Sequence, residues 1–167
     1  QHHDLSLIEA GISHPGEMDR LRECIVPTEG VLTHLGEAHL GNFDGPDHLM
    51  REKCALFKAC SRVFLPEALR LRCGPHLTQE TLTWAHAHEA EAEHAALQVE
   101  VDAAKRHLNL HWQGASATMV LPFTSDVSVH NACTAALVAL HHGATLEDIQ
   151  HKLPLLTEPT GRLSSIK

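Results

Sequence analysis

The sequence has few basic residues, no long apolar run and no paired-cysteine motif. Lys and Arg number 13 against 21 Asp and Glu, so the net charge of −8 argues against nucleic acids or anionic membranes as partners. No stretch approaches the roughly 20 apolar residues that cross a bilayer, and no signal-peptide pattern opens the chain. The five cysteines contain no Cys-x-x-Cys pair and are typical of reduced thiols in a cytosolic protein.

What remains is the composition of an ordinary globular domain. The 167 residues are 43% hydrophobic and 20% charged, which is enough to build one core. Sixteen histidines are many, but the number alone assigns no function. The chain begins at Gln1 rather than at Met, so we expect a processed protein or a piece of a longer one.

The first half of the sequence alternates short apolar runs with stretches of helical spacing. Strands separated by helices predict crossover connections and a mainly parallel sheet. We expect strands at 4–10, 30–35 and 62–65, and helices at 17–24 and 47–60.

The second half changes character. After a possible strand at 81–84, three segments alternate apolar and polar residues with period two, which predicts an antiparallel meander at 97–101, 108–112 and 117–121. An apolar helix follows from 126 to 142 and ends at Gly143, and Thr145 with Asp148 should cap a last helix. The fold class expected is α/β, a mainly parallel sheet flanked by helices with a meander in its second half.

Two polar residues follow predicted strands and should share one rim of the sheet. Glu9 closes the first apolar strand, and His39 lies in the loop after the next. The carboxyl ends of parallel strands border the ligand crevice, and a carboxylate there suits a hard cation that bridges phosphates. A turn or helix-terminus partner for Glu9, and a solvent-facing loop position for His39, remain open.

Transition-metal sites are alternatives. His34, Glu37 and His39 are similar to zinc hydrolase motifs, but the histidine spacing of five, interrupted by Gly36, does not place both on one helical face. The His- and Glu-rich run 86–94 is better explained as a solvated polar segment.

Two further residues become candidates by their place in helices. Lys53 lies inside the predicted helix 47–60 and by itself indicates only a surface lysine. Asn131 interrupts an otherwise apolar helix, so its carboxamide needs either a backbone partner or a planar ligand such as a purine edge.

In order, these residues resemble the central ATPase domain of the Mur ligases. The similarity is greatest to the branch that adds D-alanyl-D-alanine to UDP-muramoyl tripeptide, including the form fused ahead of an alanine racemase. Several motifs in the right order are more specific than any one of them. The matching stretches are LSLIEAGISHPGEMDRL, GVLTHLGEAHLGNF, MREKCALF, HNACTAALVAL and TEPTGRL.

The resemblance implies a role for each candidate. Glu9 matches the acidic magnesium ligand, and His39 matches the histidine at the second magnesium. Lys53, fourteen residues after His39, matches a lysine that is commonly carbamylated and then helps to bind Mg²⁺. Asn131 matches the asparagine beside the adenine, and Arg162 matches an arginine near the nucleotide.

The departures from the family pattern are equally specific. The Gly-x-x-Gly-Lys-[Ser/Thr] phosphate loop is absent from the 167 residues, and Val127-Ser128 stand where the family has His-Asn. We therefore expect a fragment, with 1–153 a partial central ATPase domain and 154–167 the hinge and the start of the C-terminal ligase domain. A missing strand should also expose a sheet edge that pairs with a second copy.

The resemblance implies a cytoplasmic enzyme that uses ATP and two Mg²⁺ ions. Its substrates are UDP-MurNAc-peptide and D-alanyl-D-alanine, and neither nucleic acid nor a membrane is a partner. Another Mur or folylpolyglutamate-type ligase, or a non-catalytic remnant of the fold, remains the alternative.

The absent phosphate loop leads to the first prediction. The purified 167 residues should neither hydrolyse ATP nor ligate, because nothing in the chain cradles the phosphates. Release of ADP with and without Mg²⁺ measures this, and magnesium-dependent turnover above a no-protein control contradicts it.

Overall fold

The computed structural model describes residues 5–36, 40–104 and 106–157. Its helices are α1 (Glu17–Ile25), α2 (Pro46–Ala55), α3 (Glu67–Cys73), α4 (Asp126–His141) and α5 (Leu146–Lys152). Its strands are β1 (Glu29–Val31), β2 (Arg62–Pro66), β3 (Glu80–His86), β4 (Leu97–Asp102), β5 (His107–Trp112) and β6 (Ala115–Val120). Short 3-10 turns lie at Leu40–Asn42, Gly74–His76, Ala90–His94 and Leu153–Leu155.

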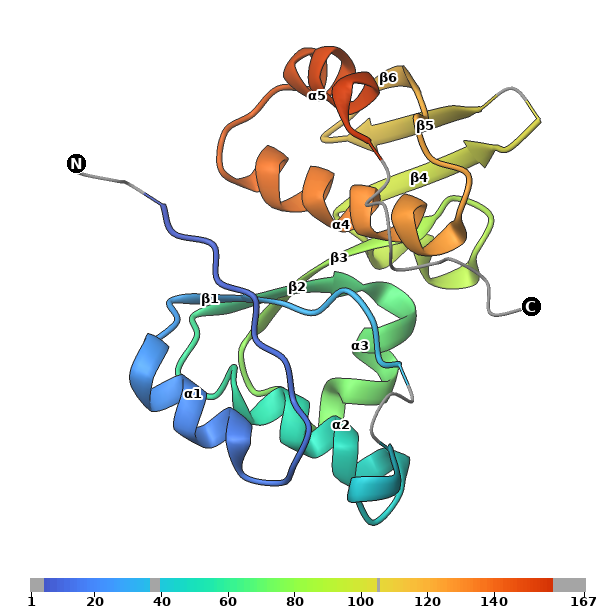
Figure 1. Cartoon of the computed structure of the whole chain (residues 1–167). Coiled ribbons are helices and arrows are strands. Elements are labelled where there is room, and N and C mark those ends of the chain that lie inside the picture. Colours follow the sequence, from blue (N-terminus) through green and yellow to red (C-terminus); the bar gives the residue numbers. More distant parts are fainter. Residues whose placement is uncertain (1–4, 37–39, 105, 158–167) are drawn as a thin grey trace.

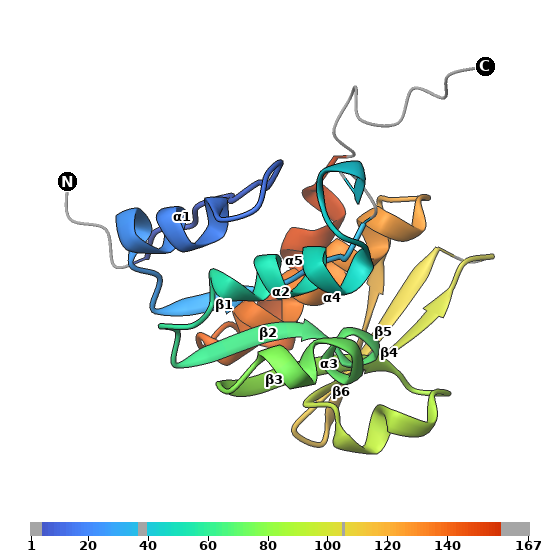
Figure 2. The ribbon, with the colours of Figure 1, turned by 90° about the horizontal axis from the view of Figure 1, so that it is seen from below.

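The strands form one mixed sheet in the order β1-β2-β3-β4-β5-β6. Strands β1 to β4 are parallel, and β4, β5 and β6 form an antiparallel meander. Helices α1, α2 and α3 lie on one side of β1 to β3, and α4 and α5 lie on the other side of the sheet (Figures 1 and 2). The predicted fold class, including the meander, is confirmed.

Burial on both faces explains the apolar run in β2. Val63, Phe64 and Leu65 are all fully buried. Val63 and Leu65 join the apolar cluster of α2 and α3, whereas Phe64 joins the cluster beneath α4. A strand covered by helices on both faces is apolar at successive positions, as this one is.

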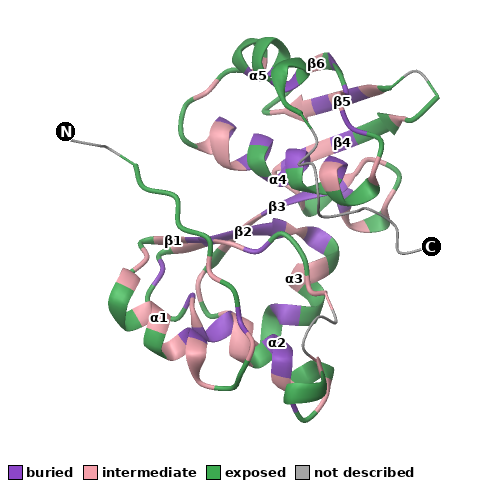
Figure 3. Ribbon diagram, viewed as in Figure 1, coloured by how far each residue is buried: buried purple, intermediate pink, exposed green. Residues whose placement is uncertain are grey.

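The meander is covered on one face only (Figure 3). Its buried residues pack with α4 and α5, while its other face carries polar cross-strand pairs such as Thr118 and Asn109, 2.7 Å apart between Oγ1 and Oδ1. This explains the period-two pattern. The buried positions are Leu97, Val99, Leu108, Leu110 and Met119.

The ends of α4 and α5 are where the sequence predicts them, within a residue. Ser125 caps α4 by accepting a hydrogen bond from the Ser128 N–H at 3.2 Å, and Gly143 follows α4 with φ of 92°. Thr145 and Asp148 form a reciprocal capping box on α5. The hydrogen bond from the Thr145 N–H holds the pKa of Asp148 below its usual range.

An ionic network joins the C-terminal end of α4 to the amino ends of the parallel strands. Arg62 on β2 donates to Glu80 on β3 at 2.7 Å and also contacts the His141 ring. His142 pairs with Glu29 of β1 at 2.7 Å. The helix therefore holds a fixed position across three strands.

Several predicted elements differ from the structure. The strand expected at 4–10 is wrong over its described part, because residues 5–10 form no strand and Leu7 is 87% exposed. A strand needs a neighbour to pair with, and no described strand lies beside this segment. In place of the strand expected at 30–35 there is a three-residue strand at Glu29–Val31, and the helix expected to reach residue 60 ends at Ala55. Helix α3 was not predicted, because a helix of seven residues gives little periodic signal.

Within the described ranges, no helix has both the length and the apolar character needed to span a bilayer. All five cysteines are free thiols, and four of them are buried.

The close approach of β1 to the turn after α2 gives a stability prediction. A Cβ at Gly30 would lie 2.3 Å from the Phe57 Cδ1 atom, inside the apolar cluster that contains Phe57. Gly30→Ala should therefore lower the free energy of unfolding by about 1–3 kcal/mol. Urea denaturation measures the change. Gly74→Ala is the matched control, since nothing lies within 4 Å of its Cβ position, and equal losses in both variants would contradict the packing argument.

Candidate functional site

The carboxyl ends of the parallel strands line one rim of the sheet, where ligands bind in open α/β folds. Glu67 follows β2 directly and is only 1% exposed. Burial alone would raise the pKa of this carboxyl, but hydrogen bonds from Arg70 and Thr83 outweigh burial and hold the pKa below its usual range. Arg70 Nε lies 2.7 Å from the Glu67 oxygen. The rim therefore carries a buried, ionised carboxylate.

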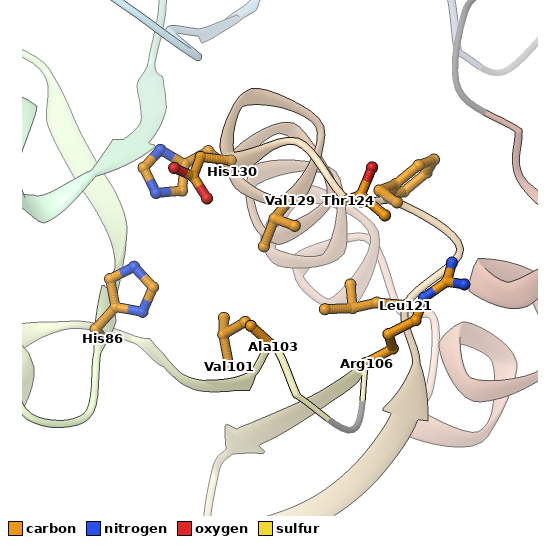
Figure 4. Close-up of a pocket in the computed structure, with 10 residues that line it drawn as sticks. His86, Val101, Ala103, Arg106, Leu121, Thr124, Val129 and His130 are labelled. Atoms are coloured by element: carbon orange, nitrogen blue, oxygen red, sulfur yellow. The ribbon is translucent and has the colours of Figure 1, made fainter.

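A cavity of about 360 Å³ opens at the ends of β3 and β4 (Figure 4). The first turns of α4 and the segment 121–124 close it on the other side. Its floor is apolar, and its polar groups come from both walls, an arrangement typical of small-ligand pockets. The lining residues are His86, Val101, Ala103, Arg106, Leu121, Phe123, Thr124, Asp126, Val129 and His130.

Trp84 fixes the two walls of this cavity relative to each other. Its indole Nε1–H, on β3, donates to Thr134 Oγ1 of α4 at 2.9 Å. The Thr134 hydroxyl in turn donates to the His130 carbonyl at 3.1 Å. Because Trp84 and Thr134 are both buried, the cavity walls are held by packing as well as by polar contacts.

Asn131, predicted beside a nucleotide base, is exposed on the first turns of α4. It follows His130, which lines the cavity. Its carboxamide forms no hydrogen bond to any residue that the structure describes. Its predicted role remains a prediction, but the alternative of a backbone partner for the side chain finds no support in the described part of the chain.

Glu9 lies in an exposed, irregular segment rather than at the end of a strand. The segment that follows it is anchored more firmly. Ala10 and Ile12 pack in an apolar cluster with Leu40 and with residues of α1 and α2. Further along, the Gly16 N–H donates to the Glu52 carboxylate of α2 at 2.6 Å. The loop that carries Glu9 is therefore attached to the helix that carries Lys53.

Lys53 is half-buried on α2, not on an open surface. Burial lowers the pKa of its amine below the usual lysine range, and the nearby Cys73 thiol opposes this shift. Cys73 also interacts with Cys54, the next residue after Lys53. A hydrogen bond between the two thiols raises the pKa of Cys54 and lowers that of Cys73.

Two predicted site residues lie outside the described residues, namely His39 and Arg162, as does Glu37 of the zinc alternative. His34, the remaining member of that motif, is exposed. Across 5–36, 40–104 and 106–157, no three His, Cys, Asp or Glu side chains are grouped closely enough to hold a metal ion. The His- and Glu-rich run 86–94 thus forms no such group.

Sequence reasoning missed Glu67, Cys73 and the pairing of His86 with His130. For Glu67 a signal was present, because an acidic residue directly after an apolar strand was the argument used for Glu9. For the other residues there was none, since their contacts join segments that are far apart in the sequence.

The chain is similar to known proteins in both sequence and fold. The sequence profile of the Mur ligase middle domain matches residues 1–139. The chain belongs to this family. Among curated proteins it is similar to the UDP-N-acetylmuramoyl-tripeptide–D-alanyl-D-alanine ligases of Haemophilus influenzae and Mycobacterium tuberculosis. The identities are 22% over 99% of the chain and 28% over 87% of the chain, respectively.

Solved structures agree on the middle-domain fold. MurF from Acinetobacter baumannii superposes with a TM-score of 0.70 at 25% identity, covering 94% of this chain and 35% of that one. A pseudomurein peptide ligase type C from Methanothermus fervidus gives a TM-score of 0.75 at 15% identity, over 93% of this chain and 39% of that one. The chain spans 36% of the H. influenzae ligase and 29% of the M. tuberculosis one, about a third of the curated relatives.

The lowered pKa of Lys53 gives a chemical prediction. Acetic anhydride reacts with the uncharged amine only, so Lys53 should reach half of its maximal labelling at a lower pH than Lys58. Peptide mass spectrometry after labelling between pH 7 and 11 measures both residues in one sample. Lys58 is the internal control, an exposed lysine paired with Asp19 at 3.2 Å. Identical pH profiles for the two lysines would contradict the burial argument.

Proposed function

We propose that this chain is the later part of the ATP-using domain of an amide-forming ligase in peptidoglycan precursor synthesis. The names of the curated relatives support a reaction that joins D-alanyl-D-alanine to a UDP-linked muramoyl tripeptide. The proposed reaction takes place in the cytoplasm, where ATP is available, and it is a property of a longer protein that contains this segment.

One observation carries the proposal, namely the packing of two loops on the helix of Lys53. Ala10 and Leu40 share an apolar cluster with Ala55 at the end of α2. These two residues are the chain neighbours of Glu9 and His39. Three segments that are separated in the sequence, each with one proposed magnesium ligand, thus meet in one layer of the fold.

The donor chemistry fits Mg²⁺. In the proposal Glu9 supplies a carboxylate and carbamylated Lys53 a carboxylate-like oxygen, and hard cations prefer such oxygen ligands. His39 adds an imidazole nitrogen. The bound ions neutralise charge on the transferred phosphoryl group. The half-buried amine of Lys53 suits carbamylation, because carbon dioxide adds to the uncharged amine and burial favours that form.

The remaining proposed residues position the nucleotide. In the proposal Asn131 presents its carboxamide to the adenine edge, and Arg162 contacts the nucleotide. The terminal carboxylate of the UDP-linked peptide attacks the γ-phosphate of ATP, so that ADP leaves and an acyl phosphate forms. The amine of D-alanyl-D-alanine then displaces phosphate through a tetrahedral intermediate, which gives the amide.

The proposal predicts a specific loss of activity in a full-length ligase that contains this segment. Lys53→Met should lower kcat by about 100-fold or more, because one metal-binding group is lost where phosphoryl transfer takes place. ADP release that requires both UDP-MurNAc-tripeptide and D-alanyl-D-alanine is the measurement.

Lys58→Met is the matched control, since Lys58 is an exposed lysine at the turn after α2 and should leave kcat within about two-fold. Full activity of Lys53→Met would refute the proposed role. If the unsubstituted ligase accepts 2,6-diaminopimelate instead of D-alanyl-D-alanine, the chain is part of a ligase that catalyses another reaction of the Mur ligase family. If it accepts neither substrate, the chain is a non-catalytic member of the fold.

A further inference from the structure

Three histidine rings meet at the mouth of the cavity between β3 and α4. The ring centroids of His86 and His130 lie 5.8 Å apart, and those of His86 and His88 lie 5.4 Å apart with nearly parallel planes. His86 ends β3 and His130 belongs to α4, so the group joins two elements that are far apart in the sequence. We call these three residues the histidine cluster.

Trp84 forms the floor of the histidine cluster. The centroid of its ring lies 5.5 Å from that of the His86 ring and 5.3 Å from that of the His130 ring, and both contacts are edge to face. The indole is only 2% exposed and is fixed by its hydrogen bond to Thr134. His130 itself is exposed to solvent, so its ring lies between the buried indole and water.

The surroundings keep His86 uncharged at neutral pH. Burial lowers the pKa of His86, and the neighbouring His130 and His88 lower it further. The one nearby group that opposes this shift is Glu89, whose carboxylate accepts a hydrogen bond from the backbone N–H of His86 at 3.1 Å. Across the cavity, α4 contributes Asp126 and the β4–β5 turn contributes Arg106.

We propose that the histidine cluster is a pH-sensitive switch on this cavity. At neutral pH the rings of His86 and His130 pack together over Trp84. In acid the histidine cluster binds protons, and positive charge held at short range in a partly desolvated site is unfavourable. His86 and His130 both line this cavity (Figure 4). In the proposed open state the exposed ring of His130 turns outward, which uncovers the indole and makes this wall of the cavity cationic.

The direction of the pH effect follows from linkage. The folded pKa of His86 lies below its unfolded value, so its neutral form stabilises the closed packing above the unfolded pKa. That contribution is lost as the pH falls from about 6.5 through the folded pKa of His86. The switch requires no nucleotide, so it does not depend on the proposed ligase activity.

Acrylamide quenching of tryptophan fluorescence tests the switch directly. The chain has two tryptophans, so Trp112→Phe isolates the signal of Trp84. Acrylamide is uncharged and reaches only exposed indoles. Between pH 7.5 and 5.0 the Stern–Volmer constant of Trp84 should rise about three-fold or more as the cover opens, while the far-UV circular dichroism stays constant.

Single substitutions identify the groups responsible. In the Trp112→Phe background, His86→Gln and His130→Gln should each abolish the rise, because each removes one ring of the contacting pair. His94→Gln is the control, since His94 is exposed and pairs with Glu93 away from the cluster, and it should keep the full rise. The proposal is overturned if the Stern–Volmer constant of Trp84 does not change with pH, or if it rises as much in His86→Gln as in the parent protein. A loss of far-UV circular dichroism over the same pH range also overturns it, because the opening is then global unfolding.

Discussion

The packing of α4 across the sheet is the constraint on which the rest of this structure depends. Its apolar face fills the largest core cluster, its middle is tied to β3 by the hydrogen bond from Trp84 to Thr134, and its C-terminal end joins the ionic network of Arg62. A helix held at these points cannot slide. Its first turns therefore close the cavity at the opposite pole of the sheet, beside Asn131.

The two faces of the sheet divide the chemistry of the domain. The α4 side holds the cavity, the histidine cluster and the residue proposed to contact the nucleotide base. The other side holds α2 with Lys53, and the loops that carry Glu9 and Leu40 are attached there. A phosphate-containing ligand that reaches both regions has to lie along the rim of carboxyl ends, which is where an α/β sheet normally binds nucleotides.

Burial favours the uncharged form of three titratable groups in this domain, but their net pKa shifts differ. Glu67 stays ionised because Arg70 and Thr83 outweigh its burial, whereas Lys53 and His86 are shifted toward their uncharged forms by burial. Such differences are typical of functional sites, where a neutral base and a charged carboxylate are needed close to each other. They also explain why the region should respond to pH near neutrality.

The sequence alone predicted the elements whose signal is local. The meander, α4 and the capped α5 were found because period-two alternation, a 16-residue apolar helix and a capping box need no distant partner. Residues 5–10 are a short apolar run that predicted a strand, yet they form none, because a strand is completed by its neighbour. The family was recognisable from motif order, and the profile match over residues 1–139 confirms it.

Other features were decided only by tertiary structure. The contact of His86 with His130, the burial of Glu67 and the approach of Cys73 to Lys53 each join segments that are distant along the chain. Spacing in a sequence reports which residues share a face of one helix or strand. Which faces then meet, and how far burial shifts the charge of a side chain between them, depends on the folding of the whole domain.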